Sequence, residues 1–184
     1  MKISPSKLTK ALADAGMTAE QAGEAISDRG FPADDAAAAV RNWARGSDHP
    51  RCKPGHINKL AQALGKASKD IVVFQSMVRG HRGSPRKAKL LTDLIRGKSV
   101  EQALNLLNFN TKRAAVNIKK CLSAAVADAQ LADADETALF VCDSRVDEGM
   151  RMKRFQPKDR GRAHPIIKPL AHITIAVEER AKKN

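Results

Sequence analysis

Apolar positions recur at helical spacing through the first seventy-five residues, in short segments separated by glycine and proline. Thr18 and Gln21 have the spacing of a capping box, and Asp34 or Asp35 is placed to cap a later alanine-rich helix. This pattern predicts a small all-helical domain over residues 1–75. Its expected inward positions are Leu8, Leu12, Ala15, Ala22, Ile26, Val40, Trp43, Ile57, Leu60, Ala61, Leu64, Ile71 and Phe74.

Three further helices are predicted between Ser84 and Ala129. Ser84 can cap the first of them, and a second capping box begins at Ser99. Thr111 is expected to open the third and longest helix. The expected inward positions are Ala88, Leu91, Leu94, Ile95, Ala103, Leu104, Leu107, Ala115, Ile118, Leu122, Ala125 and Ala129.

The period changes from helix to strand after Asp135. Residues 139–146, 150–155 and 172–177 alternate between apolar and polar, and a basic segment lies between the last two. These segments predict a hairpin over about residues 149–177. Helices followed by strands indicate an α+β domain with an antiparallel sheet over residues 76–184, and the stretch 76–83 is expected to be its boundary.

The charge of the chain is strongly positive and unevenly distributed. Thirty-three Lys and Arg against twenty Asp and Glu give a net charge of +13 and a pI near 10.0. Residues 1–75 contribute +3 and residues 76–184 contribute +10. This balance predicts a polyanionic partner bound mainly by the second half. No apolar run predicts a membrane span, and three scattered cysteines are typical of reduced thiols in the cytoplasm.

Basic residues form three groups in the second half: a segment with eight cations and three acids, a helix entrance, and a helix face. Each group could also be ordinary solvated surface. With aromatic residues at 3% and no Tyr, a base-stacking platform is not expected, which favours recognition of structured RNA through shape and phosphate. The groups are 145–168; Arg82, Arg86, Lys87 and Lys89; and Lys112, Arg113, Lys119 and Lys120.

Three strings in the second half resemble the universal large-subunit ribosomal protein family numbered twenty-two. They are SPRKAKLLTDLIRGKSVEQALNLLNF, TKRAAVNIKKCLSAAVADA and VDEGMRMKRFQPKDRGRAHPIIKPLAHITIAVEE. The resemblance covers about Met77 to Arg180. It implies three helices packed on a small antiparallel sheet, a long extended β-hairpin, and a structural role in the large ribosomal subunit. The implied partners are large-subunit rRNA and neighbouring ribosomal proteins, in a cytoplasmic ribosome.

The resemblance also implies which residues contact RNA. The hairpin would lie along rRNA, and its tip, formed by Gln156, Pro157, Lys158, Asp159 and Arg160, would reach the wall of the peptide exit tunnel. Lys158 and Asp159 depart from the family's usual Arg and Ala at the tip. With the basic groups included, the expected rRNA-binding residues are Arg82, Arg86, Lys87, Lys112, Arg113, Lys119, Lys120, Arg151, Lys153, Arg154, Lys158, Arg160, Arg162, Lys168 and His172.

The first seventy-five residues are similar to a Cro/repressor-type helix-turn-helix domain at Thr18 to Ile26, at Val40 to Gly46 and at His56 to Gly65. A DNA-binding transcriptional regulator is therefore the alternative interpretation. However, the connection at 28–35 is too long for the tight turn of that motif, so a docking or extra rRNA-contact module is favoured over sequence-specific DNA binding.

An enzyme is the third hypothesis, as an RNA-modifying activity, but no catalytic set is visible in the sequence. His49, Cys52 and His56 have the spacing of metal ligands but lack a fourth ligand nearby, and a loop without metal is expected. No cofactor and no small-molecule substrate are predicted.

Overall fold

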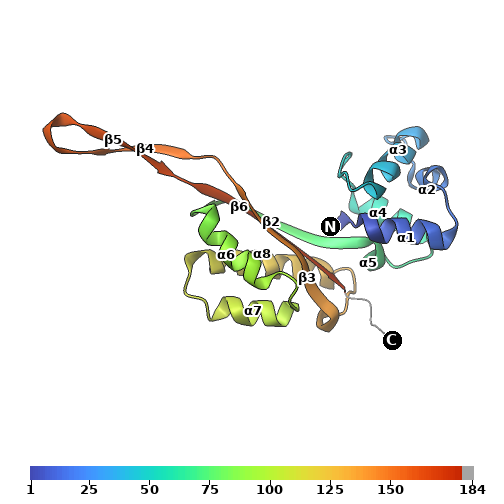
Figure 1. Cartoon of the computed structure of the whole chain (residues 1–184). Coiled ribbons are helices and arrows are strands. Elements are labelled where there is room, and N and C mark those ends of the chain that lie inside the picture. Colours follow the sequence, from blue (N-terminus) through green and yellow to red (C-terminus); the bar gives the residue numbers. More distant parts are fainter. Residues whose placement is uncertain (180–184) are drawn as a thin grey trace. The chain divides into compact units, whose positions relative to one another are not determined.

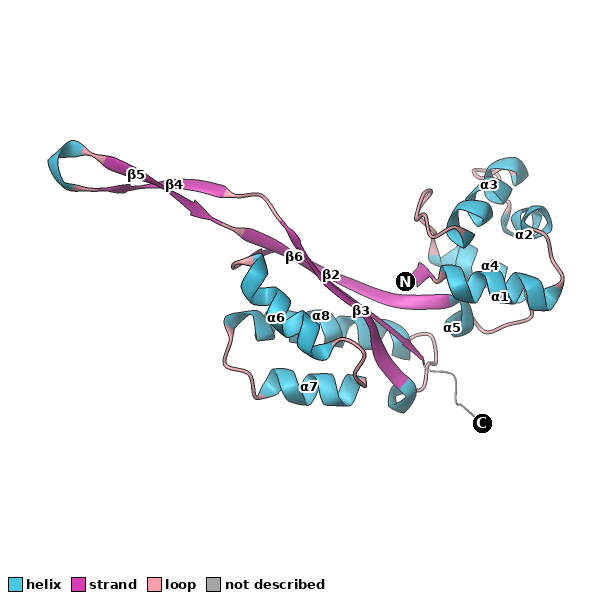
Figure 2. Cartoon of the chain, viewed as in Figure 1, coloured by secondary structure: helices cyan, strands magenta, loops and turns pink. Residues whose placement is uncertain are grey.

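The computed structural model describes residues 1–179, which fall into two compact units. The first unit comprises residues 1–74 and 131–134, and the second comprises residues 75–130 and the chain from residue 135 onward. Figures 1 and 2 show the elements. In chain order they are β1 (Lys2–Ile3), α1 (Pro5–Ala15), α2 (Ala19–Ile26), α3 (Ala33–Ala44), α4 (Pro54–Ala63), α5 (Ser68–Ile71), β2 (Val72–Arg82), α6 (Pro85–Ile95), α7 (Val100–Asn108), α8 (Arg113–Gln130), η1 (Glu136–Ala138), β3 (Leu139–Glu148), β4 (Met152–Pro157), η2 (Asp159–Gly161), β5 (Ala163–Lys168) and β6 (Leu170–Glu179).

The first unit is a helical cluster whose core is built from the apolar stripes of α1 to α5. The capping box at Thr18 and Gln21 is present at the start of α2, as the sequence predicts. Gly23 allows α2 to lie close to α3, since a Cβ there would come within 2.6 Å of the Ala37 backbone nitrogen. The fully buried side chains include Leu8, Ile26, Val40, Ile57, Leu60, Ile71 and Phe74.

Three predictions for the first unit are wrong in detail. The N-cap of α3 is Pro32 and not Asp34 or Asp35. Both acids lie in the first turn, where they interact favourably with the positive end of the helix dipole. Ala15 is exposed. Phe74 is buried but lies in β2 and not in a helix.

The second unit packs helices α6, α7 and α8 with a sheet in the order β2-β6-β3. Strands β3 and β6 are antiparallel, with Leu139 opposite Glu179 and Glu148 opposite Ala171. Helix α8 packs on β6, helix α6 packs on β3, and α7 packs mainly on α8 (Figure 2). The core comprises Leu91, Ile95, Ile118, Leu122, Leu139, Val141, Ile173, Ile175 and Val177, among others.

Helix boundaries in the second unit differ slightly from the prediction. Ser84 is the N-cap of α6, but its side chain makes no capping hydrogen bond. Thr111 lies outside α8, which begins at Arg113. Leu94, predicted to point inward, is 40% exposed and lines a surface hollow together with Leu106 and Phe109.

Strand β2 contradicts the predicted order of helices first and strands afterwards. It occupies most of the stretch 76–83, which was interpreted as a boundary, and the chain passes from the first unit to the second within it. Strand β2 pairs with β6, which follows almost one hundred residues later, so the sequence around β2 contains no sign of this pairing. Arg79 and Gly80 further obscured its pattern.

Beyond the body, the chain forms a two-stranded arm made of β4 and β5. The strands are antiparallel, with Met152 opposite Lys168 and Pro157 opposite Ala163. The body sheet and the arm are separate sheets (Figure 1). Pro169, which cannot donate a backbone hydrogen bond, lies between β5 and β6. Most residues of both strands are exposed, so the arm contributes little to the core.

Candidate nucleic-acid interface

A groove of about 940 Å³ collects cations from all three basic groups predicted from the sequence. It lies where the end of β2, the starts of α6 and α8, and the base of the arm come together. Among the described residues that line it, none is acidic. Its cations are Arg82, Lys87, Lys112, Arg113 and Lys168.

Two helix N-termini open onto this groove. Ser84 and Ala88 bring the first turn of α6 to its wall, and Lys112 and Ala114 bring the first turn of α8. Helix N-termini carry a partial positive charge and unsatisfied N–H groups, both of which favour an anion. The cationic side chains and the helix N-termini therefore both favour binding of an anion in the groove.

His81 forms part of the groove lining and is otherwise buried. Its Nδ1 lies 2.6 Å from Nδ2 of Asn117 on α8. Burial, and then the positive charge of Arg113, lower the pKa of His81, so the imidazole is held neutral. A Cβ at Gly83 would come within 2.6 Å of His81 Nε2, so a side chain there would force the imidazole to move.

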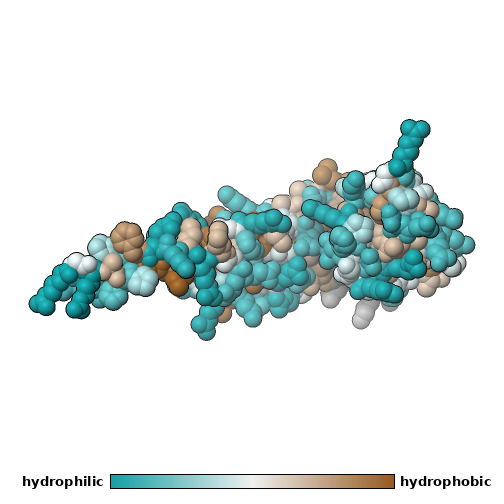
Figure 3. Space-filling model, turned by 90° about the horizontal axis from the view of Figure 1, so that it is seen from above, coloured by the Kyte–Doolittle hydropathy of each residue, from teal (hydrophilic) through white to brown (hydrophobic). Residues whose placement is uncertain are grey.

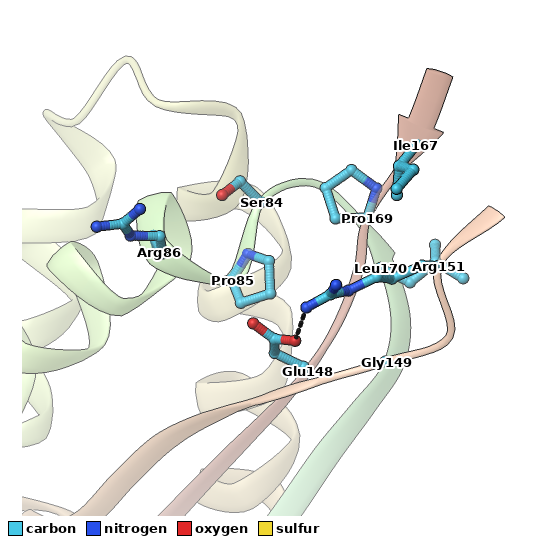
Figure 4. Close-up of a pocket in the computed structure, with 9 residues that line it drawn as sticks. All are labelled: Ser84, Pro85, Arg86, Glu148, Gly149, Arg151, Ile167, Pro169 and Leu170. Atoms are coloured by element: carbon cyan, nitrogen blue, oxygen red, sulfur yellow. Dashed lines mark hydrogen bonds and ion pairs between the residues drawn. The ribbon is translucent and has the colours of Figure 1, made fainter. Parts of the chain in front are cut away.

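The base of the arm is a smaller hollow of about 230 Å³ (Figure 4). Arg86, a predicted rRNA contact, lines this hollow and not the larger groove. Arg151 Nη2 donates to Glu148 Oε2 at 2.8 Å, so part of its charge is already balanced within the protein. Because both side chains are more than half exposed, this ion pair contributes little to stability.

The remaining predicted contacts of the arm are all exposed. In Figure 3 the arm, at the left of the view, is covered mostly by hydrophilic side chains with scattered apolar ones. At its tip Arg160 and Gly161 both have positive φ, and Lys158 N–H donates to Arg162 O at 2.7 Å. This tight turn displays Lys158, Arg160 and Arg162 to solvent, and Lys153 and Arg154 are exposed on β4.

His172 has a structural partner in the protein. The Gly80 N–H donates to His172 Nδ1 at 3.1 Å, which links β2 to β6. A Cβ at Gly149 would come within 3.1 Å of Nε2 of the same ring. The imidazole is therefore held at the base of the arm, and its proposed contact with RNA would have to coexist with this role.

Some predicted residues stay apart, and some lining residues were missed. Lys119 and Lys120 are exposed on α8 but do not line the groove. The groove wall also includes the apolar residues Leu90, Met152 and Ile167, which sequence reasoning did not select. Leu90 is 60% exposed and falls outside the inward stripe of its helix, which is the one signal that could have identified it.

The first unit offers little support for DNA recognition. The exposed residues of α3 are Ala33, Asp34, Asp35, Ala38 and Arg41, so the would-be recognition helix presents two acids and few groups that read bases.

Among residues 1–179 no group of His, Cys, Asp and Glu has the arrangement of a metal site. None of the helices in this range is long and apolar enough to cross a membrane.

An α+β body with converging cations and a basic two-stranded arm defines a class of protein that holds a structured polyanion. The model of the family described as Ribosomal protein L22p/L17e matches residues 76–178 of the 184. The chain belongs to this family. It is therefore a ribosomal protein, a structural constituent of the large ribosomal subunit and not an enzyme by class.

Proposed function

We propose that the chain binds large-subunit rRNA through the cationic groove of its second unit and through the arm. The groove carries the proposal, because five cations from distant parts of the sequence line one concave surface with no acid among the described lining residues. A phosphate backbone is the partner whose charge and shape fit such a surface.

The chemistry of the groove suits phosphate oxygens. Arg82 and Arg113 can donate pairs of N–H groups to them, while Lys87, Lys112 and Lys168 supply positive charge. The first turn of α8 adds backbone N–H groups, and α6, which begins with Pro85, adds mainly the positive end of its dipole. The apolar wall at Leu90 and Ile167 can contact the sugar edge of the same strand.

The arm would extend this binding surface along rRNA. Its strands are exposed on both faces, as expected for an element ordered by a partner outside the chain. From the family resemblance, we expect its tip, Gln156 to Arg160, to reach the wall of the peptide exit tunnel. Lys158 and Asp159 would give that tip a mixed charge in this chain.

The test is rRNA binding by the full chain at several salt concentrations. A variant with Lys87→Gln and Lys112→Gln removes two groove charges, and Lys89→Gln with Lys98→Gln removes two charges outside the groove. Each lost phosphate contact should reduce the slope of log K against log salt by roughly 0.7–0.9. The groove variant should therefore lose about 1.5 in slope.

The control variant should keep nearly all of the wild-type slope. Equal slopes for the two variants would contradict the groove as the phosphate site. Far-ultraviolet circular dichroism of each variant establishes that a lower affinity does not arise from unfolding.

A further inference from the structure

Residues 1–74 of the first unit lie outside the matched family range, and their charges are unevenly distributed along the chain. Residues 41–53 contain four cations and one acid, giving +3, which equals the net charge of the whole first seventy-five residues. Residues 20–35 contain five acids and one cation, giving −4. The positive charge is therefore concentrated at the end of α3 and in the loop that leads to α4.

This loop is ordered by hydrogen bonds to α3. The Trp43 Nε1–H donates to Pro50 O at 2.8 Å, and Asn42 Nδ2 donates to His49 O at 3.1 Å. Trp43 is 2% exposed and Cys52 is 6% exposed, so the loop is anchored in the core near both of its ends. The loop therefore has a defined shape.

The cations of the segment point outward from this anchored loop. Arg41, Arg45, Arg51 and Lys53 are all exposed, and within the described residues no ion pair neutralises any of them. By contrast, Lys59 pairs with Asp28 at 2.5 Å and Lys66 pairs with Asp14 at 2.6 Å elsewhere in the unit. Four cations on an ordered surface lose less conformational entropy on binding a polyanion than cations on a mobile tail.

We infer that the 41–53 segment is a second RNA-binding surface, which contacts the phosphate backbone of large-subunit rRNA. The inference rests on the proposed function, since membership of the large subunit places rRNA around the chain. Duplex DNA fits less well. A helix-turn-helix domain would turn α2 and the start of α3 toward DNA, and residues 20–35, which include both, have a net charge of −4.

The experiment uses the full chain and transcribed large-subunit rRNA. The loop variant carries Arg45→Gln, Arg51→Gln and Lys53→Gln, and the matched control carries Lys2→Gln, Lys10→Gln and Arg29→Gln in the same unit. Both lose three charges. The loop variant should lose about 2 in the slope of log K against log salt, and the control should lose less than about 0.7.

The outcomes separate this inference from the proposed function. If wild-type protein binds rRNA and the loop variant behaves like the control, the second surface is wrong and the groove proposal stands. If wild-type protein does not bind rRNA, both proposals fail. If duplex DNA competes for the wild-type protein as well as rRNA does, but does not compete for the loop variant, the partner of this surface is DNA and the inference is overturned.

Discussion

In the second unit, close packing around His81 restricts which residues can occupy the neighbouring positions. His81 occupies a buried position between Gly83 and Asn117, with Arg113 near enough to affect its titration. Neither the burial nor the partner follows from the sequence, because Asn117 is thirty-six residues away along the chain. The sequence showed only a histidine in a basic stretch, so its role as part of the groove lining depends on the tertiary fold.

The lowered pKa of His81 predicts a specific dependence of stability on pH. In the unfolded chain the His81 imidazole is protonated with its ordinary pKa of 6.5, and in the folded chain it is protonated only at lower pH. The neutral imidazole therefore contributes its full stability above pH 6.5, and this contribution is lost as pH falls through the lowered folded pKa. In denaturant titrations, His81→Gln should flatten the fall in unfolding free energy below pH 6.5. An unchanged slope would contradict this assignment.

Among the elements, the arm and the body ladder should differ in stability. An isolated two-stranded ribbon is marginal in water, and β4 and β5 have no helix or third strand packed on them among the described residues. By contrast, β3 and β6 lie in the body sheet and contact α6 and α8.

Hydrogen exchange of the isolated protein tests this difference. Amides of β4 and β5 should open at a cost of roughly 0–2 kcal/mol, while those of β3 and β6 should approach the global free energy of unfolding. Protection of residues 152–168 equal to that of the body strands would show that the protein itself orders the arm.

The sequence predicted elements whose signals are local and missed β2, whose partner β6 is distant along the chain. The capping box at Thr18 and the strand alternation of residues 172–177 depend on near neighbours, and both appear in the structure. Strand β2 depends on β6, so the stretch 76–83 taken alone predicts a boundary and not a strand. The groove was predicted only as three separate patches, because pattern alone cannot say which surfaces meet.

At the scale of the whole molecule, the chain joins a family domain to an additional helical unit. The matched range begins at residue 76, whereas the first unit contains residues 1–74 and 131–134. Most of the net charge belongs to residues 76–184, yet the extension has a net charge of +3 within the 41–53 segment. We therefore expect the second unit to dominate rRNA binding and the extension to add to it.

The most direct test of the ribosomal assignment is sedimentation of tagged full-length protein through high-salt sucrose gradients. We expect the protein to travel with large subunits, because a constituent assembled into the subunit is retained, whereas a protein bound only by phosphate contacts dissociates as the salt concentration rises. Recovery of the protein only at the top of the gradient, with large subunits sedimenting without it, would contradict the account.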